Sequence, residues 1–481
     1  MLYRVIFFKL KTYPAKFGLN SNTSLFCMNH FFSIYRREIA DTFRLSLPIV
    51  IAQLGVILMG VTDNIMVGRF LGAKALGAAG LANSLSFLVS SFGVGGLGVV
   101  AALISQAKGQ DNVPEIGRTF KAGLWAALLL GVILAVLSAI LGYYLHLFNQ
   151  TAEITALSQP FMYILSFSIV PLFLFVATRQ LSDGLSLPRV AMFITVSALV
   201  VNTLFNYWLI NGIWFFPKMG LNGSATATLI ARFYMAGAIL VYVFNNQQFA
   251  KYLNTNNAVS IKDLVQKIFF MIVSTGLQFF FEIAAFSLAV VMIGWLGENQ
   301  LAAHQIAINM ASTTYMMATG IAAAGAIRVG RAFGQQDKTA VFRAATAAFL
   351  LVTAFMGFCC VLFLTANDLL VTLYLTDNAP VMQIAAGLVI IAGFFQLSDG
   401  IQAIALGALR GVSDINLPTL ITLIAYWVLA LPLSYLLAFT FKMDAAGVWV
   451  ALLIGLTFSA VFLTFRFYHL LQKLDMTTAK S

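Results

Sequence analysis

The sequence predicts an all-α integral membrane protein with twelve transmembrane helices. Of its 481 residues, 60% are hydrophobic and 9% are charged, whereas soluble domains carry about 25% charged residues. The apolar residues lie in long runs, each at least as long as the roughly 20 residues that a helix needs to cross a bilayer. Most of the 28 Lys and Arg residues fall between these runs, so the formal charge of +11 reflects membrane topology rather than a nucleic-acid surface.

The predicted spans follow one another along the chain. They consist of Ala, Leu, Ile, Val, Phe and Gly without two-residue alternation, which favours helices over a β-barrel. Pro48, Pro171 and Pro432 lie inside spans, where membrane helices tolerate proline better than soluble helices do. The expected limits are 44–68, 76–104, 119–146, 154–178, 186–212, 221–247, 264–294, 299–327, 340–366, 380–408, 416–441 and 445–469.

The basic residues predict the orientation of these spans. If the N-terminus is cytoplasmic, both tails and the even-numbered loops hold nearly all Lys and Arg, which is the positive-inside pattern. We therefore expect both termini in the cytoplasm and an even number of spans. The exceptions are Arg69, Lys74, Lys218 and Lys442 on the outer side and Arg232 inside a span.

An internal repeat divides the chain into two halves. Each half holds six spans in the same order, and because six is even, both halves enter the membrane from the same side. This arrangement predicts a pseudo-twofold axis along the membrane normal. The matched segments are 71–78 with 296–303, 105–110 with 330–335, and 218–223 with 442–447.

The repeat sets the expected domain limits. Residues 1–27 are basic and aromatic but too short to span, so we expect either a misassigned start, with Met28 as the true one, or a disordered tail. The expected parts are a cytoplasmic tail at 1–43, a first lobe with spans 1–6 at 44–250, a cytoplasmic linker at 251–263, a second lobe with spans 7–12 at 264–470, and a C-terminal tail at 471–481.

Three acidic residues lie inside predicted spans: Asp63 in span 1, Glu282 in span 7 and Asp399 in span 10. A carboxylate is costly at membrane depth and usually marks an ion or substrate pathway. Such groups exchange protons or, in pairs, bind Na⁺. Because span 7 is the repeat equivalent of span 1, we expect Asp63 and Glu282 to face one cavity from opposite sides. The alternative is a structural role, in which each acid pairs with a buried donor such as Arg232 or extends its carboxylate to the membrane interface.

Amide side chains accompany these acids. Gln278 lies one turn from Glu282 on the same helix face, which makes it a candidate substrate contact. Gln396 and Gln402 lie three residues on either side of Asp399. Hydrogen bonds between helices explain such amides equally well.

Motifs of other protein classes are missing from the sequence. It contains no G-x-x-x-x-G-K-[ST] phosphate loop, no H-E-x-x-H or G-x-S-x-G motif, and no Cys and His spacing of a zinc site. We therefore expect no enzyme, no bound nucleotide, no nucleic acid and no cofactor beyond a coupling ion. Any transport must then use an existing ion gradient.

Residues 60–69, 302–309, 327–334 and 399–411 together resemble the multidrug and toxic compound extrusion (MATE) family, on its bacterial NorM-like branch. The resemblance covers residues 40–470. It implies a V-shaped pair of six-helix lobes in the bacterial inner membrane. The implied activity is antiport, in which cationic amphipathic drugs or toxins leave in exchange for Na⁺ or H⁺. The implied partners are organic cations, the coupling ion and the lipid bilayer, and we expect a monomer.

The resemblance also implies roles for individual residues. Asp63 matches an acid that handles protons or drug in the first lobe, and Glu282 and Asp399 match the pair that couples the cation, as Na⁺ ligands if sodium is used. Gln305 and Asp377 match positions that contact drug. Phe395 stands where many relatives have tyrosine, so one hydroxyl ligand for Na⁺ is lost. The resemblance therefore does not decide whether the coupling ion is Na⁺ or H⁺.

One alternative within transport is a lipid-linked saccharide flippase of the same superfamily. A flippase that carries an anionic pyrophosphate needs several basic residues in its cavity. Arg232 is the one basic residue predicted deep inside a span, more than one turn from either end.

Overall fold

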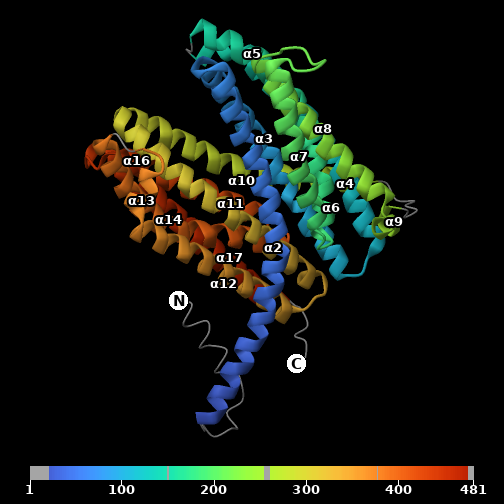
Figure 1. Ribbon diagram of the computed structural model, residues 1–481. Helices are drawn as coiled ribbons and strands as arrows, with labels where there is room; N and C mark the ends of the chain where they lie inside the picture. Colours follow the sequence, from blue (N-terminus) through green and yellow to red (C-terminus); the bar gives the residue numbers. More distant parts are fainter. Residues whose placement is uncertain (1–20, 149–150, 254–260, 376–377, 475–481) are drawn as a thin grey trace.

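The computed structural model describes residues 21–148, 151–253, 261–375 and 378–474, and this part of the chain is helical without β-strands (Figure 1). The predicted all-α membrane fold is confirmed. The first half contains α2 (Ser21–Leu71), α3 (Ala73–Gly109), α4 (Val113–Tyr143), η1 (Leu145–Phe148), α5 (Ala152–Phe167), α6 (Ile169–Gly184), α7 (Arg189–Asn211) and α8 (Leu221–Asn245), followed by the short α9 (Gln247–Leu253). The second half contains α10 (Lys262–Gly294), α11 (Glu298–Gly334), α12 (Lys338–Thr365), α13 (Asn367–Thr372), α14 (Ala379–Gly411), α15 (Asn416–Leu423), η2 (Ile424–Ala430), α16 (Leu431–Tyr435), η3 (Leu436–Thr440) and α17 (Asp444–Lys473).

Eleven helical segments among the described residues are long and apolar enough to cross a membrane. They correspond to eleven of the predicted spans, with α5 and α6 together forming the fourth. The remaining predicted span, 299–327, lies in the 37-residue helix α11. This helix is long enough but less apolar, because polar side chains such as Thr313, Thr314 and Thr319 interrupt it. It packs against α2, α3, α12 and α14, so much of its surface faces protein.

The helices run beyond several predicted limits. Arg328 and Arg331 belong to the last turns of α11, and Arg410 belongs to the last turn of α14. The predicted linker at 251–263 falls partly on α9 and α10, and its central residues, 254–260, lie outside the described residues, as do residues 1–20 of the N-terminal tail.

Two of the three prolines Pro48, Pro171 and Pro432 coincide with local breaks. Pro171 has no N–H to donate to the carbonyl four residues earlier, and the fourth span breaks at Ser168, between α5 and α6. Pro432 lies in α16, which is flanked by the π-helical turns η2 and η3. A π-helical turn shifts the helix face locally and often lies at functional sites. Pro48 lies inside the unbroken α2.

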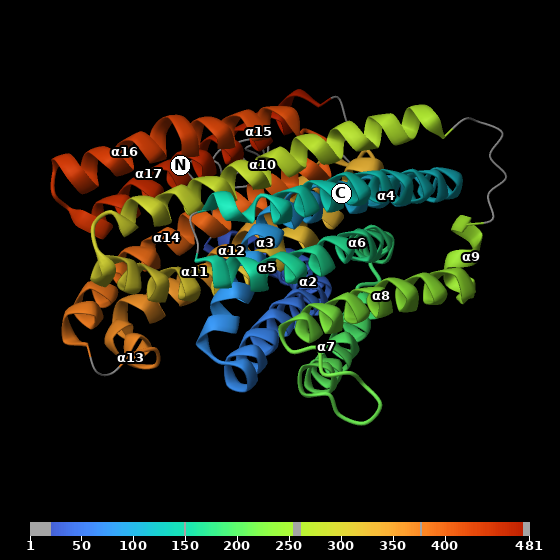
Figure 2. The same cartoon turned by 90° about the horizontal axis from the view of Figure 1, so that it is seen from above.

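The first helix of each half packs against the second helix of the other half. α2 packs against α11, and α10 packs against α3. In Figure 1, α3–α8 gather on one side of α2 and most of the second half lies on the other. Seen from above in Figure 2, α2 and α3 lie near the middle, with α7 and α8 at one edge and α16 and α17 at the opposite edge. The two halves therefore meet where the first helix of each contacts the second helix of the other.

Two glycines show that this junction has the predicted twofold character. A Cβ atom on Gly109 would lie 2.1 Å from the carbonyl oxygen of Arg331, and one on Gly334 would lie 2.1 Å from that of Gln106. Gly109 matches Gly334 in the repeat, and Gln106 matches Arg331. The contact is thus reciprocal, as a twofold relation requires. Only glycine permits α3 and α11 to approach so closely here.

Candidate functional site

Asp63 lies in a polar cluster built within the first half. One carboxylate oxygen, Oδ1, accepts a hydrogen bond from Nδ2 of Asn206 on α7. The other, Oδ2, accepts one from the hydroxyl of Thr228 on α8 at 2.8 Å. Asp63 is 9% exposed and Asn206 is fully buried. Three helices, α2, α7 and α8, therefore hold this carboxylate by neutral donors.

Arg232 does not form the ion pair with Asp63 that a purely structural role predicts. Its Nη1 atom instead donates to the hydroxyl of Ser168 at 2.5 Å, at the break between α5 and α6. Within the part of the chain that the structure describes, Oδ1 of Asn206 and the hydroxyl of Ser224 are buried without a partner. Buried polar atoms are normally satisfied. The unpaired atoms therefore mark this cluster as a place for a water molecule, an ion or a substrate group.

Glu282 lies in a second polar cluster, built within the second half. Its Oε1 atom accepts hydrogen bonds from Gln402 Nε2 on α14 at 3.2 Å, from Tyr315 on α11 at 3.4 Å and from Tyr426 on η2 at 3.5 Å. Gln402 also donates to the Tyr426 hydroxyl at 3.1 Å. The carboxylate is thus oriented through one oxygen by donors from three other elements. Its second oxygen, Oε2, is buried and has no partner among the described residues.

Asp399 lies three residues before Gln402 on α14, within electrostatic range of Glu282. It is 4% exposed and makes no hydrogen bond to another described residue. Gln396, one turn earlier on the same helix, has both amide atoms buried without a partner, and Nε2 of Gln278 is also unpaired. The second half therefore brings together the predicted Glu282, Asp399 and Gln278, with several oxygen atoms that have no partner.

These oxygens are of the ligand type that hard cations prefer. The described residues contain no group of three or more His, Cys, Asp or Glu side chains that would hold a metal ion. Na⁺ is a hard cation, and hard cations prefer oxygen ligands, which Glu282, Asp399 and Gln396 carry. Phe395 offers none, because its ring packs against Trp449 at 5.7 Å and Phe286 at 6.0 Å.

One basic side chain also lies at this cluster. The guanidinium of Arg410 stacks over the ring of Phe279, with its central carbon 5.4 Å from the ring centre. It is within electrostatic range of Glu282. An arginine on an aromatic face keeps a cation close to a carboxylate without an ion pair.

Gln305 is not among the described hydrogen-bond partners of Asp63 or Glu282. Gln305 is exposed on α11, ten residues before Tyr315. Asp377 lies outside the described residues. His304, beside Gln305, is buried and accepts a hydrogen bond from Trp449 Nε1 at 3.1 Å, which suits a structural role. Asp63 and Glu282 have separate sets of hydrogen-bond partners, one in each half, rather than a shared one.

The sequence argument missed the neutral partners of the acids. Asn206 carried a usable signal, because Asn202 and Asn206 place two amides on one face of a predicted span. Thr228, Tyr315 and Tyr426 carried none, since threonine and tyrosine are common in membrane helices and have no diagnostic spacing.

The chain is similar to known proteins over most of its length. A family model described as MatE matches residues 48–208 and 274–436, one segment in each half. The probable multidrug resistance protein NorM of Rhizobium meliloti (strain 1021) is 32% identical over 442 residues, covering 91% of this chain and 94% of the relative. The protein of the same description from Pseudomonas putida is 31% identical over 446 residues, covering 91% and 96%.

Solved structures share the fold. A crystal structure of the eukaryotic MATE transporter AtDTX14 superposes with a TM-score of 0.82 at 19% identity, covering 92% of this chain and 98% of that chain. A crystal structure of a mutant of the Vibrio cholerae MATE transporter VcmN also reaches a TM-score of 0.82, at 15% identity, covering 92% and 99%. At these identities the likeness concerns the fold alone.

Proposed function

The chain belongs to the MatE family of membrane transporters, and we propose that it exports organic cations from the bacterial cell in exchange for Na⁺ or H⁺. Membership makes it a multi-pass membrane transporter rather than an enzyme. The relatives described as probable multidrug resistance proteins support drugs or toxins as the exported class. The proposal adds that the substrate moves out of the cell, that an ion moves in exchange, and which residues couple these two movements.

The observation that carries the coupling proposal is the difference between the two oxygen atoms of the Glu282 carboxylate. Three donors hold Oε1, while among the described residues Oε2 has no partner and Asp399 makes no hydrogen bond. Two buried carboxylates that form no ion pair are unfavourable unless a bound cation or proton neutralises them. A proton or a Na⁺ ion supplies that charge, and its release frees the site to change conformation. We therefore assign ion coupling to Glu282 and Asp399.

Asp63 is proposed as the substrate-side and proton-handling acid of the first half. Its carboxylate is held by the neutral donors Asn206 and Thr228, while Arg232 donates to Ser168, so an organic cation or a proton can bind the acid without displacing an ion pair. Gln278, Gln305 and Asp377 remain proposed drug contacts. The proposed setting is the inner membrane, with both termini in the cytoplasm and a monomer as the working unit.

A lipid-linked saccharide flippase is less favoured by the same residues. The polar clusters inside the two halves centre on carboxylates, and their nearby basic residues, Arg232 and Arg410, contact Ser168 and Phe279. An anionic pyrophosphate would need basic groups that are free to bind it.

Export by living cells tests the proposal. The chain is expressed in a bacterial strain without its own drug exporters, and the cells are loaded with a fluorescent organic cation. We expect the chain to lower dye retention severalfold, and Glu282→Gln to abolish this effect at equal membrane expression. Equal retention with and without the wild-type chain would contradict drug export.

A further inference from the structure

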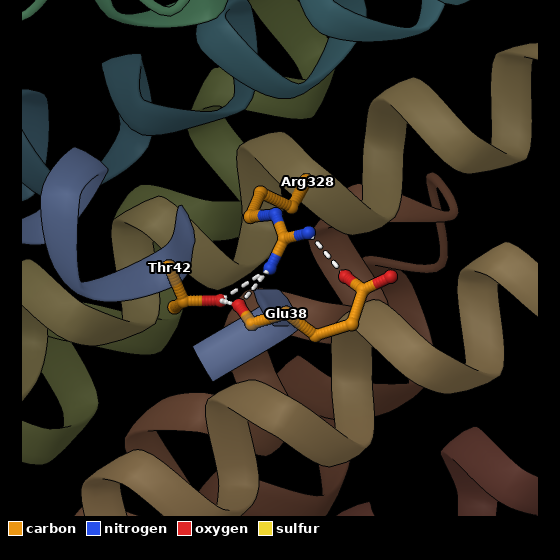
Figure 3. Close-up of polar contacts among 3 residues, drawn as sticks. All are labelled: Glu38, Thr42 and Arg328. Atoms are coloured by element: carbon orange, nitrogen blue, oxygen red, sulfur yellow. Dashed lines mark hydrogen bonds and ion pairs between the residues drawn. The ribbon is translucent and has the colours of Figure 1, made fainter. Parts of the chain in front are cut away.

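Arg328 joins the two halves at the end of the molecule that carries the basic loops (Figure 3). It lies on α11 of the second half, and its guanidinium reaches α2 of the first half. Nη1 donates to the carbonyl oxygen of Glu38 at 2.5 Å and to the hydroxyl of Thr42 at 2.6 Å. Nη2 forms an ion pair with the Glu38 carboxylate. One side chain thus binds three acceptors across the junction.

The setting of this contact makes it stronger than an ordinary surface ion pair. The side chains of Arg328 and Glu38 are 19% and 24% exposed, and Thr42 is fully buried. Hydrogen bonds from a guanidinium to a carboxylate are charge-assisted, and partial burial limits their screening by salt. The contact is also additional to the apolar packing of Ile49, Ala324 and Ile327 deeper in the same seam.

The repeat shows that the contact occurs on one side only. At the shift that relates the halves, Leu103 matches Arg328 and Asp263 matches Glu38. No ion pair between described residues crosses the α3–α10 seam. That seam instead holds a cavity of about 180 Å³, lined by residues that include Leu103, Gln106 and Lys267. The α2–α11 contact therefore contains an ion pair, whereas the equivalent α3–α10 contact contains a cavity.

Neutral hydrogen bonds complete the closure at this end. Gln106 on α3 donates to the carbonyl oxygen of Gly411 at 2.7 Å and to the hydroxyl of Ser413 at 2.9 Å. Neutral hydrogen bonds contribute less than charge-assisted ones. Arg328 is therefore the strongest single polar link between the halves at this end among the described residues.

We propose that the Arg328–Glu38–Thr42 contact is a one-sided latch that keeps the halves closed at the basic-loop end and that breaks in every transport cycle. The proposal rests on the transport function proposed above, because exchange across a membrane requires this end to open. When the halves separate, α11 moves away from α2 and the guanidinium leaves all three acceptors together. The unlatched α3–α10 seam then acts as the side that opens with less resistance.

A cysteine introduced at a buried position between the halves reports their separation without a transport assay. Ser105 is fully buried, and its hydroxyl faces Gly330, where a Cβ would lie 2.3 Å away. Ser105→Cys is introduced into the full chain after the native Cys27, Cys359 and Cys360 are replaced. The rate of its reaction with a polar maleimide in membrane vesicles then reports how often the two halves separate.

We expect Arg328→Ala to raise this labelling rate by about tenfold. Glu38→Gln, which keeps the backbone carbonyl and Thr42 as acceptors, should raise it severalfold and still tests the latch if Arg328→Ala fails to fold. The matched control is Arg118→Ala, since Arg118 pairs with Glu115 at 3.4 Å within one helix, with side chains 25% and 34% exposed. The control should leave the rate unchanged.

The outcomes separate the latch from the proposed function. Unchanged labelling in both Arg328→Ala and Glu38→Gln would overturn the latch, because the halves would then separate equally often with and without the contact. An equal increase in the Arg118→Ala control would also overturn it, since any lost charge would suffice. Faster labelling in a chain that exports no cation would support the latch and contradict drug export.

Discussion

Gln402 donates a hydrogen bond to Oε1 of Glu282 at 3.2 Å, while Oε2 of the same carboxylate is buried without a partner in the described structure. The two residues come from α14 and α10, which are far apart in the sequence. The amide orients the carboxylate through one oxygen and leaves the other unpaired, within electrostatic range of Asp399, and this arrangement is the basis of the proposed ion coupling.

Replacing Glu282 by glutamine removes the charge but keeps the size and the hydrogen-bonding capacity of the side chain. We expect ion-driven efflux to fall by more than about tenfold, because each tenfold in rate needs about 1.4 kcal/mol of lost interaction and a desolvated charge contributes more. Dye efflux from vesicles at equal protein content measures the effect. Glu153→Gln is the matched control, since Glu153 is exposed and pairs with Lys74. Wild-type rates in Glu282→Gln would remove it from the coupling role.

Gln402→Leu tests whether the amide positions Glu282. A hydrogen bond to a charged group contributes roughly 1.5–3 kcal/mol, so the ion concentration for half-maximal efflux should rise about tenfold. The maximal rate should change less, because Tyr315 and Tyr426 still hold Oε1. A loss of maximal rate with an unchanged ion requirement would indicate that Gln402 only supports the fold.

Asp63→Asn separates the first cluster from the second. The asparagine side chain has the same size but no negative charge, and it lacks one of the two oxygens that accept hydrogen bonds from Asn206 and Thr228. We therefore expect export to weaken severalfold. Efflux is measured at high and at low external pH, with Asp368→Asn on the exposed first turn of α13 as the control. Unchanged export at both pH values would assign Asp63 a structural role.

Gly334→Ala tests the close approach of the halves. The added Cβ would lie 2.1 Å from the Gln106 carbonyl oxygen, so the two helices must move apart. We expect a loss of about 1–3 kcal/mol in stability, seen as a lower melting temperature in detergent. Gly237→Ala is the control, because nothing lies within 4 Å of its Cβ position. The control should be neutral or slightly stabilising, since alanine favours helices. Equal melting temperatures for both variants would contradict the proposed packing.

The spans were predictable because hydrophobic length is a strong and local signal. The prediction was weakest at α11, because its polar side chains lower the mean hydropathy of the helix. Neighbouring helices cover much of its surface. The twofold relation was also predictable, since 105–110 and 330–335 match in sequence. The contacts of α2 with α11 and of α10 with α3 were not predictable, because a repeat fixes the order of helices along the chain and not which helices meet at the junction.

The acids were predictable and their surroundings were not. Asp63, Glu282 and Asp399 stand out because charges inside spans are rare. The expectation that Asp63 and Glu282 share one cavity used only the repeat, and the structure gives each acid its own partners. Those partners come from α7, α8, α11, α14 and η2, and sequence spacing on one helix says nothing about residues on another.

The measurement that tests the central claim most directly uses vesicles that contain the purified protein and a fluorescent organic cation. A Na⁺ gradient and an H⁺ gradient are imposed separately on the wild type, on Glu282→Gln and on Asp399→Asn. We predict that one gradient drives efflux in the wild type and that neither gradient drives it in the two variants. Wild-type efflux in both variants would contradict ion coupling at Glu282 and Asp399, and no efflux from the wild type under either gradient would contradict exchange with Na⁺ or H⁺.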